Sequence, residues 1–540
     1  MLMKHQKAAL ERYEGSSVIP LFFDPGLGKT YTSIAIADRK YFNGEIDAVL
    51  VIAPNGVDKQ WANQEIPKWC ESDYTVYNNK KSKKLIPFQQ GKLNFVCVNI
   101  DQFSTISSYV RYVEWANAHN TMIVLDEATR IKNPKAKRTE RLLYEFNTVV
   151  KRGRAIISSV PKTRARIILT GTPITNGLCD VWAMFEFLSP GYFGLNWYAF
   201  QNKYEMFHAI DVNGRCIRVP INEQIWQVIK GCNSFEQANL ATGITLDTYD
   251  VIKSQDHYEG PYKHVEQLRK LMMKDAMFVK IEDVQDMPEQ VYIKRLVDMD
   301  SEQDRIYHEM ENEMIATYQN QEVTAKSKLT MYLRLQQIAS GFVVPAIDFS
   351  SMTEEEALTY LQDPKPAEAQ WVSDTKIKQL ILDLEELKDE PVIIVTHFSA
   401  EAQTLYEKLT AEGHRVCMQT GFKRVGTIEG FQNGEFNILL ANIKVISMGF
   451  NLQRAHYMFF YSNTFSLEDR IQVEARIYRT GQRNRCIYYD YISTNTIDMK
   501  VLAALRSKKT LSDYVRDKSA EECLTGWDKE CQEVFDDIVF

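Results

Sequence analysis

Short apolar runs recur along the first half of the chain, and each is bounded by polar or turn-forming residues. These runs are residues 18–23, 47–54, 93–99, 121–125 and 166–169. Continuous apolar runs of this length are typical of strands that are buried on both faces of a parallel sheet. Segments with helical periodicity, such as residues 31–37, lie between them. Strands that alternate with helices predict a doubly wound α/β lobe.

A second set of apolar runs lies in the last third of the chain. These runs are residues 391–398, 436–442 and 456–461. They predict a second parallel sheet, and a chain of 540 residues is longer than one hydrophobic core usually serves. We place the boundary near Pro288, so that residues 1–287 form the N-terminal lobe and residues 288–540 the C-terminal lobe.

Two further stretches complete the predicted domain organisation. Residues from about 192 to 270 are rich in aromatic and polar side chains. A structureless loop of that length is unusual in a compact protein, so we expect an inserted, mostly helical segment. Residues from about 300 to 370 show helical patterns and predict a helical lead-in to the second sheet. Helices are also expected at the C-terminus of the second lobe.

The composition narrows the class of protein. Hydrophobic residues make up 45% and charged residues 25% of the chain, as in globular proteins. No apolar run reaches the length of a membrane span, and the N-terminus lacks a signal-peptide core, which together favour an intracellular protein. The nine cysteines include no C-x-x-C pair, which argues against a zinc module or a disulfide framework.

The net charge does not decide whether the chain binds nucleic acid. The formal net charge is −7 at pH 7. Charges are screened over about 8 Å at physiological salt, so a local basic groove matters more than the sum over the chain. Basic residues follow residue 129, and they are either solvated surface or contacts to a DNA backbone. They are Arg130, Lys132, Lys135, Lys137, Arg138, Lys151, Arg152, Arg154, Lys162, Arg164 and Arg166.

The first candidate site is the loop Asp24-Pro25-Gly26-Leu27-Gly28-Lys29-Thr30, between the first apolar run and a helical segment. Such a loop directs backbone N–H groups and a helix dipole at one place, where a polyphosphate fits. Lys29 is expected to reach the β- and γ-phosphates of a nucleotide and Thr30 to ligate Mg²⁺. The general pattern has glycine where this chain has Phe23, and a turn without a ligand is the alternative.

Two carboxylates directly follow the apolar run 121–125. Asp126 is expected to hold Mg²⁺ through water, and Glu127 to orient or deprotonate the attacking water. A chance acidic pair is the alternative, but charge at the edge of a sheet is costly to bury without a purpose. Upstream of the loop, Gln6 offers a donor and an acceptor that could recognise an adenine edge, although a surface glutamine is the simpler interpretation.

The last candidate site is the stretch from Gln472 to Gln482. The spacing of Gln472, Arg476 and Arg479 predicts that the three side chains project from one face of a helix. Guanidinium groups in such a position could stabilise charge that develops on a γ-phosphate. An arginine-rich solvated helix is the alternative.

Taken in order, these motifs resemble those of superfamily 2 helicases, and of the Swi/Snf-type DNA translocases in particular. The segments that carry the resemblance are His5-Gln6, 24–30, Asp126-Glu127-Ala128-Thr129, 169–176 and 472–482. The resemblance implies two RecA-like lobes and a role for Thr170, Gly171 and Thr172 in coupling the nucleotide site to DNA. It also assigns DNA contacts to Asn442 and Gly449, although the family usually has Ser-Thr where this chain has Ala441-Asn442. Asp-x-Gly-x-Gly-Lys-Thr is the family's form of the loop, and Pro25 replaces its usual methionine.

The resemblance implies an ATP- and Mg²⁺-dependent motor that moves along duplex DNA with little sequence preference, as a minimal bacterial or viral form. The expected location is then the bacterial cytoplasm, the host cell of a virus, or the nucleus of a eukaryote. The nearest alternative is a strand-separating superfamily 2 DNA or RNA helicase. An alternative of another class is an ATP-gated clamp that binds nucleic acid and turns over slowly. No membrane partner is expected, and a protein partner is not identified.

Overall fold

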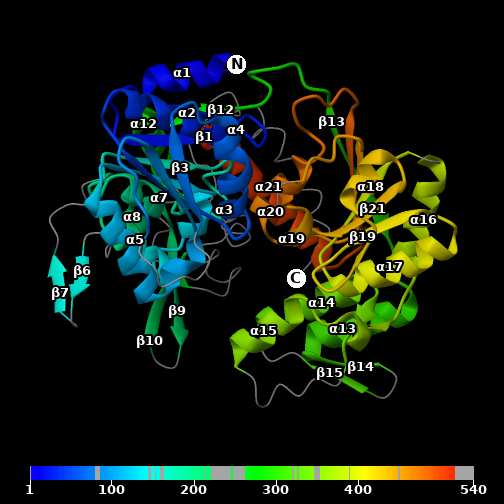
Figure 1. The fold of residues 1–540 in the computed structure, drawn as a ribbon. Helices are drawn as coiled ribbons and strands as arrows, with labels where there is room; N and C mark the ends of the chain where they lie inside the picture. The colour runs from blue at the N-terminus through cyan, green and yellow to red at the C-terminus, as the bar shows by residue number, and fades with distance from the viewer. Residues whose placement is uncertain are drawn as a thin grey trace. The chain divides into compact units, whose positions relative to one another are not determined.

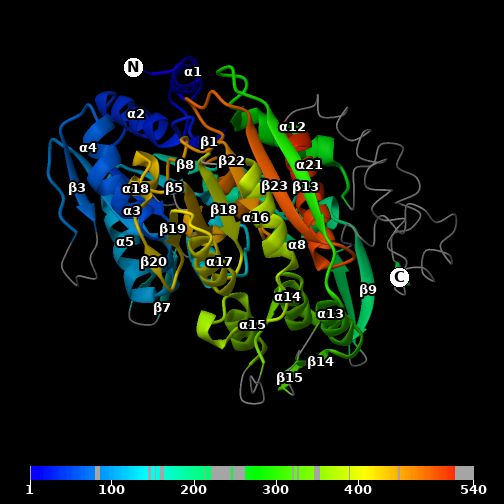
Figure 2. The same cartoon turned by 90° about the vertical axis from the view of Figure 1, so that its right-hand side faces the viewer.

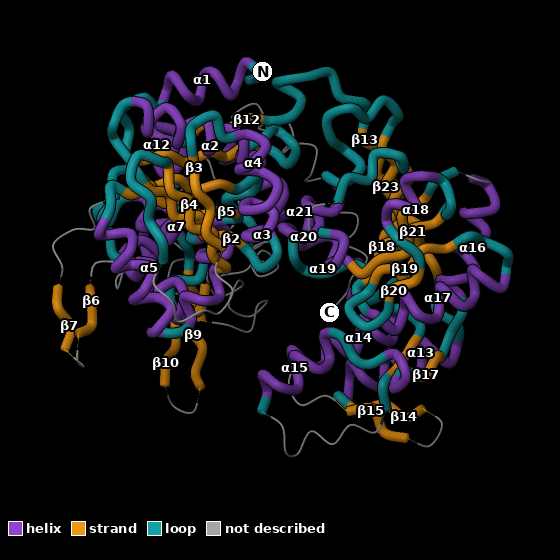
Figure 3. The backbone as a smooth tube through the Cα atoms, viewed as in Figure 1, coloured by secondary structure: helices purple, strands orange, loops and turns teal. Residues whose placement is uncertain are grey.

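The computed structural model describes residues 2–78, 86–143, 148–151, 154–157, 163–212, 215–220, 245–246, 262–318, 321–324, 328–345, 353–387, 390–447 and 450–516. The chain divides into two compact units. Of the described residues, unit 1 takes in those up to Val284 and those from Lys508 to Arg516, and unit 2 takes in those from Gln285 to Ser507. Each unit is built around its own seven-stranded sheet, with helices around the strands (Figures 1 and 3).

The sheet of unit 1 has the strand order β12-β1-β8-β5-β2-β4-β3, and every neighbouring pair is parallel. The strands are β1 (Val18–Phe23), β2 (Ala48–Ala53), β3 (Tyr74–Asn78), β4 (Leu93–Asn99), β5 (Thr121–Asp126), β8 (Ala165–Leu169) and β12 (Met277–Val279). The five apolar runs of the first half therefore all form strands. Their residues are buried because helices cover the faces of the sheet.

The helices of unit 1 connect these strands. Those up to the strand β8 are α1 (Lys4–Arg12), α2 (Lys29–Phe42), α3 (Val57–Gln60), the π-helix η1 (Trp61–Glu65), α4 (Ile66–Trp69), η2 (Ile100–Ser104), α5 (Ile106–Ala118), η3 (Ala128–Ile131) and α6 (Lys137–Leu143). After β8 come α7 (Asp180–Leu188), α8 (Trp197–Tyr204) and α12 (Val265–Asp275). Side chains of α5, α7 and α12 share one buried core with β1, β2, β4, β5 and β8.

The described part of segment 192–270 is not mostly helical. Between α8 and α12 lie β9 (Phe207–Val212), β10 (Arg215–Pro220) and β11 (Thr245–Leu246), which form an antiparallel sheet with the order β10-β9-β11. The aromatic and polar composition of this segment carries no clear period, so strand pairing between distant residues was not predictable from it. Residues 221–244 and 247–261 lie outside the described residues, and for them the prediction stays a prediction. A short antiparallel pair, β6 (Thr148–Lys151) with β7 (Arg154–Ile157), precedes β8.

The sheet of unit 2 has the order β13-β23-β22-β18-β21-β19-β20 and is parallel except for the pair of β19 and β20. Its strands are β13 (Gln290–Val297), β18 (Val392–Thr396), β19 (Val416–Gln419), β20 (Arg424–Val425), β21 (Ile438–Asn442), β22 (Tyr457–Phe460) and β23 (Cys486–Ser493). Figure 2 shows β13 and β23 side by side, in the register that pairs Gln290 with Cys486. The three predicted strands of this half, which became β18, β21 and β22, are confirmed.

The helices of unit 2 flank this sheet and form the predicted lead-in. They are α13 (Ser301–Glu313), α14 (Lys328–Ala339), α15 (Glu354–Gln362), η5 (Pro366–Glu368), α16 (Thr375–Leu387), α17 (Ser399–Ala411), α18 (Ile428–Asn433), α19 (Ile443–Ile446) and α20 (Leu467–Glu474). Two short antiparallel pairs, β14 (Ile315–Tyr318) with β15 (Gln321–Thr324) and β16 (Phe342–Val343) with β17 (Gln370–Trp371), accompany them. The predicted fold class, two doubly wound RecA-type lobes with parallel sheets, is confirmed.

The last described helix, α21 (Ile497–Arg516), corrects the predicted end of the second lobe. We expected residues 288–540 to form one lobe, but the helix passes from unit 2 into unit 1 at Lys508. The helical period of the sequence does not reveal which core a terminal helix joins, because the period records only that one face is apolar. Among the residues that the structure describes, no helix has the length and apolar character that a membrane span requires.

Candidate functional site

The strand order of unit 1 brings three candidate segments to one edge of the sheet. The strand β8 lies between β1 and β5, and Leu169 of β8 pairs with both Leu21 and Asp126. Because these strands are parallel, the segments that follow them leave the sheet at the same edge. The loop 24–30, the pair Asp126 and Glu127, and the segment 170–172 are therefore neighbours, as the sequence predicted for a nucleotide site.

The loop has the backbone conformation that its glycines permit. Gly26 has φ of 87° and Gly28 has φ of 72°, in the left-handed region that side chains disfavour. Gly28 is the N-cap of α2, so the N-terminus of a 14-residue helix opens directly from the loop. A Cβ at Gly28 would press on Nε2 of Gln6, the end of a flexible side chain that would have to shift, so the backbone conformation is the main reason for glycine there.

Lys29 lies folded against its own loop. Its Nζ donates to the carbonyl of Phe23 at 2.9 Å and to that of Asp24 at 3.5 Å. Burial lowers the pKa of Lys29, and the nearby charges of Glu127, Asp126 and Asp24 oppose this shift. The ammonium group therefore lies close to the carboxylates that follow β5, in the arrangement expected of a lysine that meets a polyphosphate. Thr30, the predicted Mg²⁺ ligand, follows in the first turn of α2 and is half-buried.

Asp126 ends β5 and is 7% exposed. Its Oδ2 accepts a hydrogen bond from Nε1 of Trp61 at 2.7 Å, and its Oδ1 accepts the backbone N–H of Glu127 at 3.0 Å. Burial raises the pKa of the Asp126 carboxyl, while the bond from Trp61 and the charge of Lys29 act against that change. A carboxylate has about four lone-pair positions, so each oxygen keeps room for a further partner.

Trp61 is a functional neighbour that the sequence reasoning missed. It opens the π-helix η1 and is 1% exposed. A π-helical turn inside a helix is frequent at functional sites, but its signal is not visible in a hydrophobic period. Glu127, the predicted general base, has φ of 50°, a conformation that a non-glycine residue adopts only when its surroundings impose it.

Gln6 lies against the loop, but its amide is engaged within unit 1. Its Nε2 donates to the carbonyl of Leu27 at 3.3 Å, and its Oε1 accepts the backbone N–H of Met3 at 2.8 Å. His5 shares the same carbonyl through Nε2 at 2.9 Å. The side chain of Gln6 is 3% exposed, so its evident role in this structure is to support the loop; recognition of adenine stays a prediction.

The segment after β8 packs directly on the loop. A Cβ at Gly171 would lie 3.1 Å from Cδ of Pro25 and 3.3 Å from the carbonyl oxygen of Phe23. Thr170 accepts the backbone N–H of Thr172 through Oγ1 at 3.2 Å, which shapes the turn. The proline that departs from the family pattern is thus in contact with the segment predicted to couple nucleotide and DNA, and a side chain at 171 would disturb this contact.

Unit 2 holds the predicted arginines differently from the prediction. The helix α20 ends at Glu474, so Gln472 is helical, but Arg476 and Arg479 lie in the turns that follow. The prediction that all three share one helix face is wrong. The regular spacing suggested a longer helix, but the carbonyl groups beyond Glu474 bond within tight turns, as when Arg479 accepts the N–H of Gln482 at 3.0 Å.

These turns are held to the segment that precedes β22. Arg476 donates through Nη2 to the carbonyl of Ser447, and Arg479 donates through Nη1 to the carbonyl of Phe450 at 3.4 Å. Gln482 is 8% exposed and donates through Nε2 to the carbonyls of Gln453, Ala455 and Ile477. Burial lowers the pKa of Arg479. The final glutamine of the motif therefore anchors the turn that carries the arginines.

Asn442 does not present its amide for a DNA contact in this structure. It is 3% exposed, its Nδ2 donates to the carbonyl of His397 at 2.7 Å, and its Oδ1 accepts the N–H of Lys444 at 3.0 Å. It caps α19 instead, as asparagine commonly does at a helix N-terminus. Gly449, the other residue assigned to DNA by the resemblance, lies outside the described residues.

The comparisons with known proteins agree with this geometry. Residues 7–341 match the family model of the SNF2-related domain, and residues 373–481 match that of the Helicase conserved C-terminal domain. The chain belongs to the SNF2-related family. The predicted relationship to Swi/Snf-type, helicase-like proteins is confirmed.

Individual relatives differ in how much of their length is shared. The DNA repair protein rhp54 of Schizosaccharomyces pombe is 22% identical over 92% of this chain and 55% of its own length. The chain thus spans about half of that protein. Protein p41 of Acyrthosiphon pisum secondary endosymbiont phage 1 is 23% identical over 91% of this chain and 92% of its own length. The solved Sulfolobus solfataricus SWI2/SNF2 ATPase core in complex with double-stranded DNA is 18% identical over 96% of this chain and 94% of its own, with a TM-score of 0.38, which is too low to support an argument.

Arg166, one of the basic residues considered as a DNA contact, is buried and cannot reach DNA. Arg166 lies in β8, is 6% exposed, and donates through Nη1 to the carbonyl of Phe187. Burial lowers its pKa to about 10. The prediction of a DNA contact is wrong for Arg166, because its position in a central strand directs it into the core. Lys132 instead donates to Oγ1 of Thr175 at 2.8 Å, close to the end of β8.

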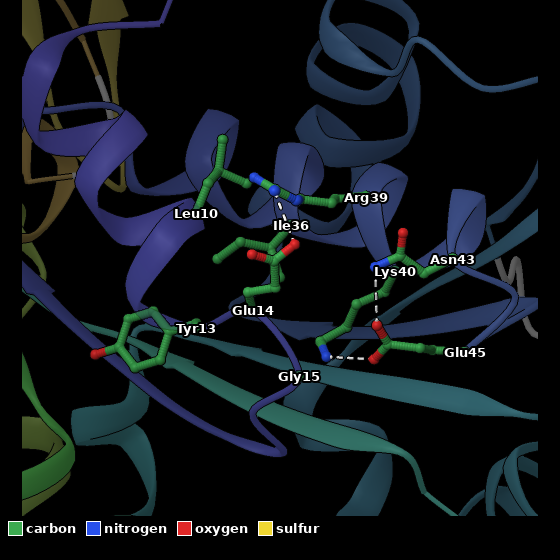
Figure 4. Close-up of a pocket in the computed structure, with 9 residues that line it drawn as sticks. All are labelled: Leu10, Tyr13, Glu14, Gly15, Ile36, Arg39, Lys40, Asn43 and Glu45. Atoms are coloured by element: carbon green, nitrogen blue, oxygen red, sulfur yellow. Dashed lines mark hydrogen bonds and ion pairs between the residues drawn. The ribbon is translucent and has the colours of Figure 1, made fainter.

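A separate pocket in the SNF2-related part is unrelated to the phosphate-binding loop. It is lined by Leu10, Tyr13, Glu14, Gly15, Ile36, Arg39, Lys40, Asn43 and Glu45 (Figure 4). These residues lie toward the C-terminal end of α2, whereas the loop opens its N-terminal end. The charged groups in the pocket bind one another, Arg39 with Glu14 at 2.8 Å and Lys40 with Glu45 at 2.7 Å. The pocket therefore offers little to a charged ligand.

Proposed function

We propose that the chain is an ATP-driven translocase on double-stranded DNA, in which hydrolysis is coupled to movement along the duplex. The observation that carries the proposal is the convergence of Lys29, Asp126 and Glu127 at one edge of the unit 1 sheet, in a chain of the SNF2-related family. Membership of the family supports the choice of ATP as the nucleotide and of DNA as the track. The proposal is made for this chain alone, because the alignment with rhp54 covers 55% of that protein's length.

The residues of the loop fit a bound polyphosphate. Lys29 now donates to carbonyls of its own loop, and these weak partners can be exchanged for phosphate oxygens without unfolding anything else. Gly26 and Gly28 allow the backbone to approach a ligand closely. The positive end of the α2 dipole adds to the attraction of an anion. Asp24, which opens the loop, is among the residues predicted to line the nucleotide site, and its side chain accepts the backbone N–H of Ile281.

The two residues proposed for Mg²⁺ also fit that ion. Thr30 offers a hydroxyl in the first turn of α2, and Asp126 has free lone pairs beside its bonds to Trp61 and Glu127. Oxygen donors of this kind suit Mg²⁺, which usually keeps several waters and binds through one or two side chains and the phosphates. When bound, the ion would neutralise phosphate charge.

The other hydrolytic roles are those that the motifs of the sequence predict. Glu127 orients or deprotonates the attacking water, and Lys29 holds the phosphates. Arg476 and Arg479 stabilise the negative charge of the transition state, a contribution of roughly 10³ to 10⁵ in rate where arginine fingers have been measured. Gln472, on the last turn of α20, completes this set. The segment after β8, Thr170-Gly171-Thr172, couples nucleotide binding at the loop to the binding of DNA. The contact between Gly171 and Pro25 connects this segment to the loop.

The test is a panel of nucleic acids in an ATP hydrolysis assay. The wild-type chain is measured with duplex DNA, single-stranded DNA, RNA and no nucleic acid, and stimulation is expected to be strongest with the duplex. Because the DNA contacts are mainly to phosphates, stimulation should fall steeply as salt is raised. Stimulation by RNA alone would contradict the proposal and favour an RNA helicase.

The same assay separates a motor from a clamp. Glu127→Gln should remove DNA-stimulated hydrolysis, by a factor of about 10² to 10⁴ for a general base, while nucleotide binding is retained. Displacement of a third strand from a triplex, without separation of the underlying duplex, then tests directional movement. A wild-type chain that binds DNA and ATP, but hydrolyses no faster with DNA, would be a clamp.

A further inference from the structure

The last turns of α21 are built into the core of unit 1. Val515 is 1% exposed and belongs to the same buried cluster as Phe22 of β1, and Leu511 packs against that cluster. Lys508 donates to Oδ1 of Asn176, in the segment that follows β8, at 3.4 Å. The C-terminal end of the described chain is therefore fixed beside the edge of the sheet that carries the candidate nucleotide site.

Arg516, the last residue of α21, forms an ion pair with the first residue of the phosphate-binding loop. Its Nη2 donates to Oδ1 of Asp24, and the two side chains are 8% and 17% exposed. The other oxygen of Asp24 accepts the backbone N–H of Ile281 at 3.0 Å. The backbone N–H of Asp24 donates to the carbonyl of Val279 at 3.0 Å. Arg516 thus completes a set of bonds that holds the start of the loop.

The surrounding charges show that this pair lies within reach of the phosphate-binding lysine. The pKa of Lys29 is lowered mainly by burial, and the charge of Arg516 lowers it further. Asp513, one turn earlier on α21, faces the same place. Burial raises the pKa of Asp513, the cations Lys509, Arg516 and Lys280 lower it, and Asp24 raises it. Arg516 is therefore part of a charge cluster around the loop.

We propose that Arg516 is a positioning residue for nucleotide binding, which acts by neutralising and holding Asp24. Without a cation, the Asp24 carboxylate would face a site that must accept a polyphosphate, and the two negative groups would repel each other. With Arg516 in place, Asp24 keeps the loop anchored and adds no net charge to it. The inference rests on the proposed function in that the ligand of the loop is taken to be a nucleotide.

A direct contact between Arg516 and a phosphate is the rival role for the same side chain. Nε of Arg516 is buried, and within the described ranges it has no hydrogen-bond partner. An arginine that bound the phosphate itself would lower the dissociation constant whether or not Asp24 carried a charge. A double-mutant cycle with Asp24 separates the two roles, because an effect through Asp24 must vanish when that charge is removed.

The experiment measures hydrogen exchange of the loop peptide and affinity for a fluorescent ADP analogue with Mg²⁺, using the full chain without DNA. The variants are Arg516→Gln, Arg516→Lys, Asp24→Asn and the double variant with Arg516→Gln. Arg516→Gln should weaken affinity about tenfold, equivalent to 1.4 kcal/mol. It should also speed exchange in residues 24–30, even without nucleotide. In the Asp24→Asn background, Arg516→Gln should change affinity less than about twofold. Arg516→Lys should restore part of the affinity.

The control is Lys500→Ala, which removes a cation from the same helix. Lys500 lies 4.0 Å from Glu311 in unit 2, and both measurements should stay at the wild-type level. Thermal unfolding of every variant verifies that α21 remains docked. An undiminished effect of Arg516→Gln in the Asp24→Asn background would overturn the proposal in favour of a direct phosphate contact. Unchanged exchange and affinity in Arg516→Gln would overturn it outright. A wild-type chain that bound no nucleotide would refute the proposed function, and the exchange data would still decide whether Arg516 holds the loop.

Discussion

The two units hold their candidate residues by different means. In unit 1, Lys29 opens a helix and Asp126 ends a strand, so the position of each is set by regular structure. In unit 2, Arg476 and Arg479 lie in turns beyond α20, and their places depend on bonds to the carbonyls of Ser447 and Phe450. Unit 1 therefore presents a site that the sheet fixes, whereas unit 2 presents one that side chains fix.

This difference bears on the proposed function, because a motor would have to alternate between states. Groups at strand ends move with the whole sheet, because a packed core deforms very little. Groups on turns can shift when a few hydrogen bonds are exchanged, at a net free energy of about 1 kcal/mol for each bond. We therefore expect unit 1 to bind nucleotide with a nearly constant geometry. In unit 2, we expect the positions of Arg476 and Arg479 to change between states.

The strongest test of this contrast is Arg479→Ala. Loss of the guanidinium should lower the DNA-stimulated turnover number by a factor of about 10³ or more, while affinity for ADP changes little. The matched control is Arg483→Ala, an exposed arginine just beyond the same turn, which should keep full turnover. Steady-state hydrolysis and nucleotide titration check both variants. Normal turnover in Arg479→Ala would leave the turn of unit 2 without a role in hydrolysis.

A second test compares the buried carboxylates of the two units. Asp126 has Lys29 nearby, and Glu401 of α17 has Lys376 nearby. Glu401 is 0% exposed and accepts bonds from Ser462, His397 and Phe398. Burial raises the pKa of Glu401 to about 7 from 4.5. The folded state then binds this proton more tightly than the unfolded state does, so stability is full below pH 4.5 and falls as pH rises through 7.

The corresponding variant is Glu401→Gln, which carries no titrating proton. Relative to wild type, it should become more stable between pH 5 and pH 8, by an amount on the order of 3 kcal/mol at most. Unfolding by urea at several pH values measures the difference between the two proteins, so that other titrating groups cancel. A difference that stays constant with pH would show that Glu401 is ionised in the folded state.

A third test loosens the turn of unit 2 without removing either arginine. Gln482→Ala deletes bonds to three carbonyls, two of them in buried bonds, and should lower the stability of unit 2 by about 1 to 3 kcal/mol. Turnover should fall as well, because Arg479 loses its fixed position. Calorimetry and hydrolysis assays measure the two effects. Gln403→Ala, which removes a glutamine bonded to Glu407 on the surface of α17, is the control and should change neither.

The smallest effect on activity is expected in unit 1, when the hydrogen bond from Trp61 to Asp126 is removed. Trp61→Phe keeps an aromatic side chain but removes the five-membered ring with the N–H that donates to Asp126. Loss of a partner that orients a metal-binding side chain typically lowers activity by about 10- to 100-fold. We expect kcat/KM for ATP to fall about tenfold. Trp69→Phe is the matched control, since its Nε1 donates to Glu65. If Trp61→Phe lowered ATP hydrolysis more than Gln482→Ala does, the site of unit 1 would depend on side-chain support more than that of unit 2, contrary to our expectation.

Much of the fold was predictable from local patterns. The apolar runs identified β1, β2, β4, β5 and β8 of unit 1, because strands buried on both faces are apolar throughout. Other strands were missed. One is β13, whose exposed and half-buried residues mix along its length, and another is β23, which is buried but carries Tyr and Asp side chains in place of a continuous aliphatic run. The loop 24–30 was recognisable as a candidate site because a loop rich in glycine between a strand and a helix is a local feature of the chain.

What the sequence determined by itself is the chemistry and the order of its parts: the loop with Lys29, the acidic pair after β5 and the arginines near the end of α20. Only the tertiary structure decided how these groups are supported. Trp61 beside Asp126, Gln482 beneath the arginine turn and Arg516 on Asp24 are all contacts between residues far apart in the chain or within irregular turns. Local periodicity records which face of an element is apolar, and it does not record which distant side chain meets that face.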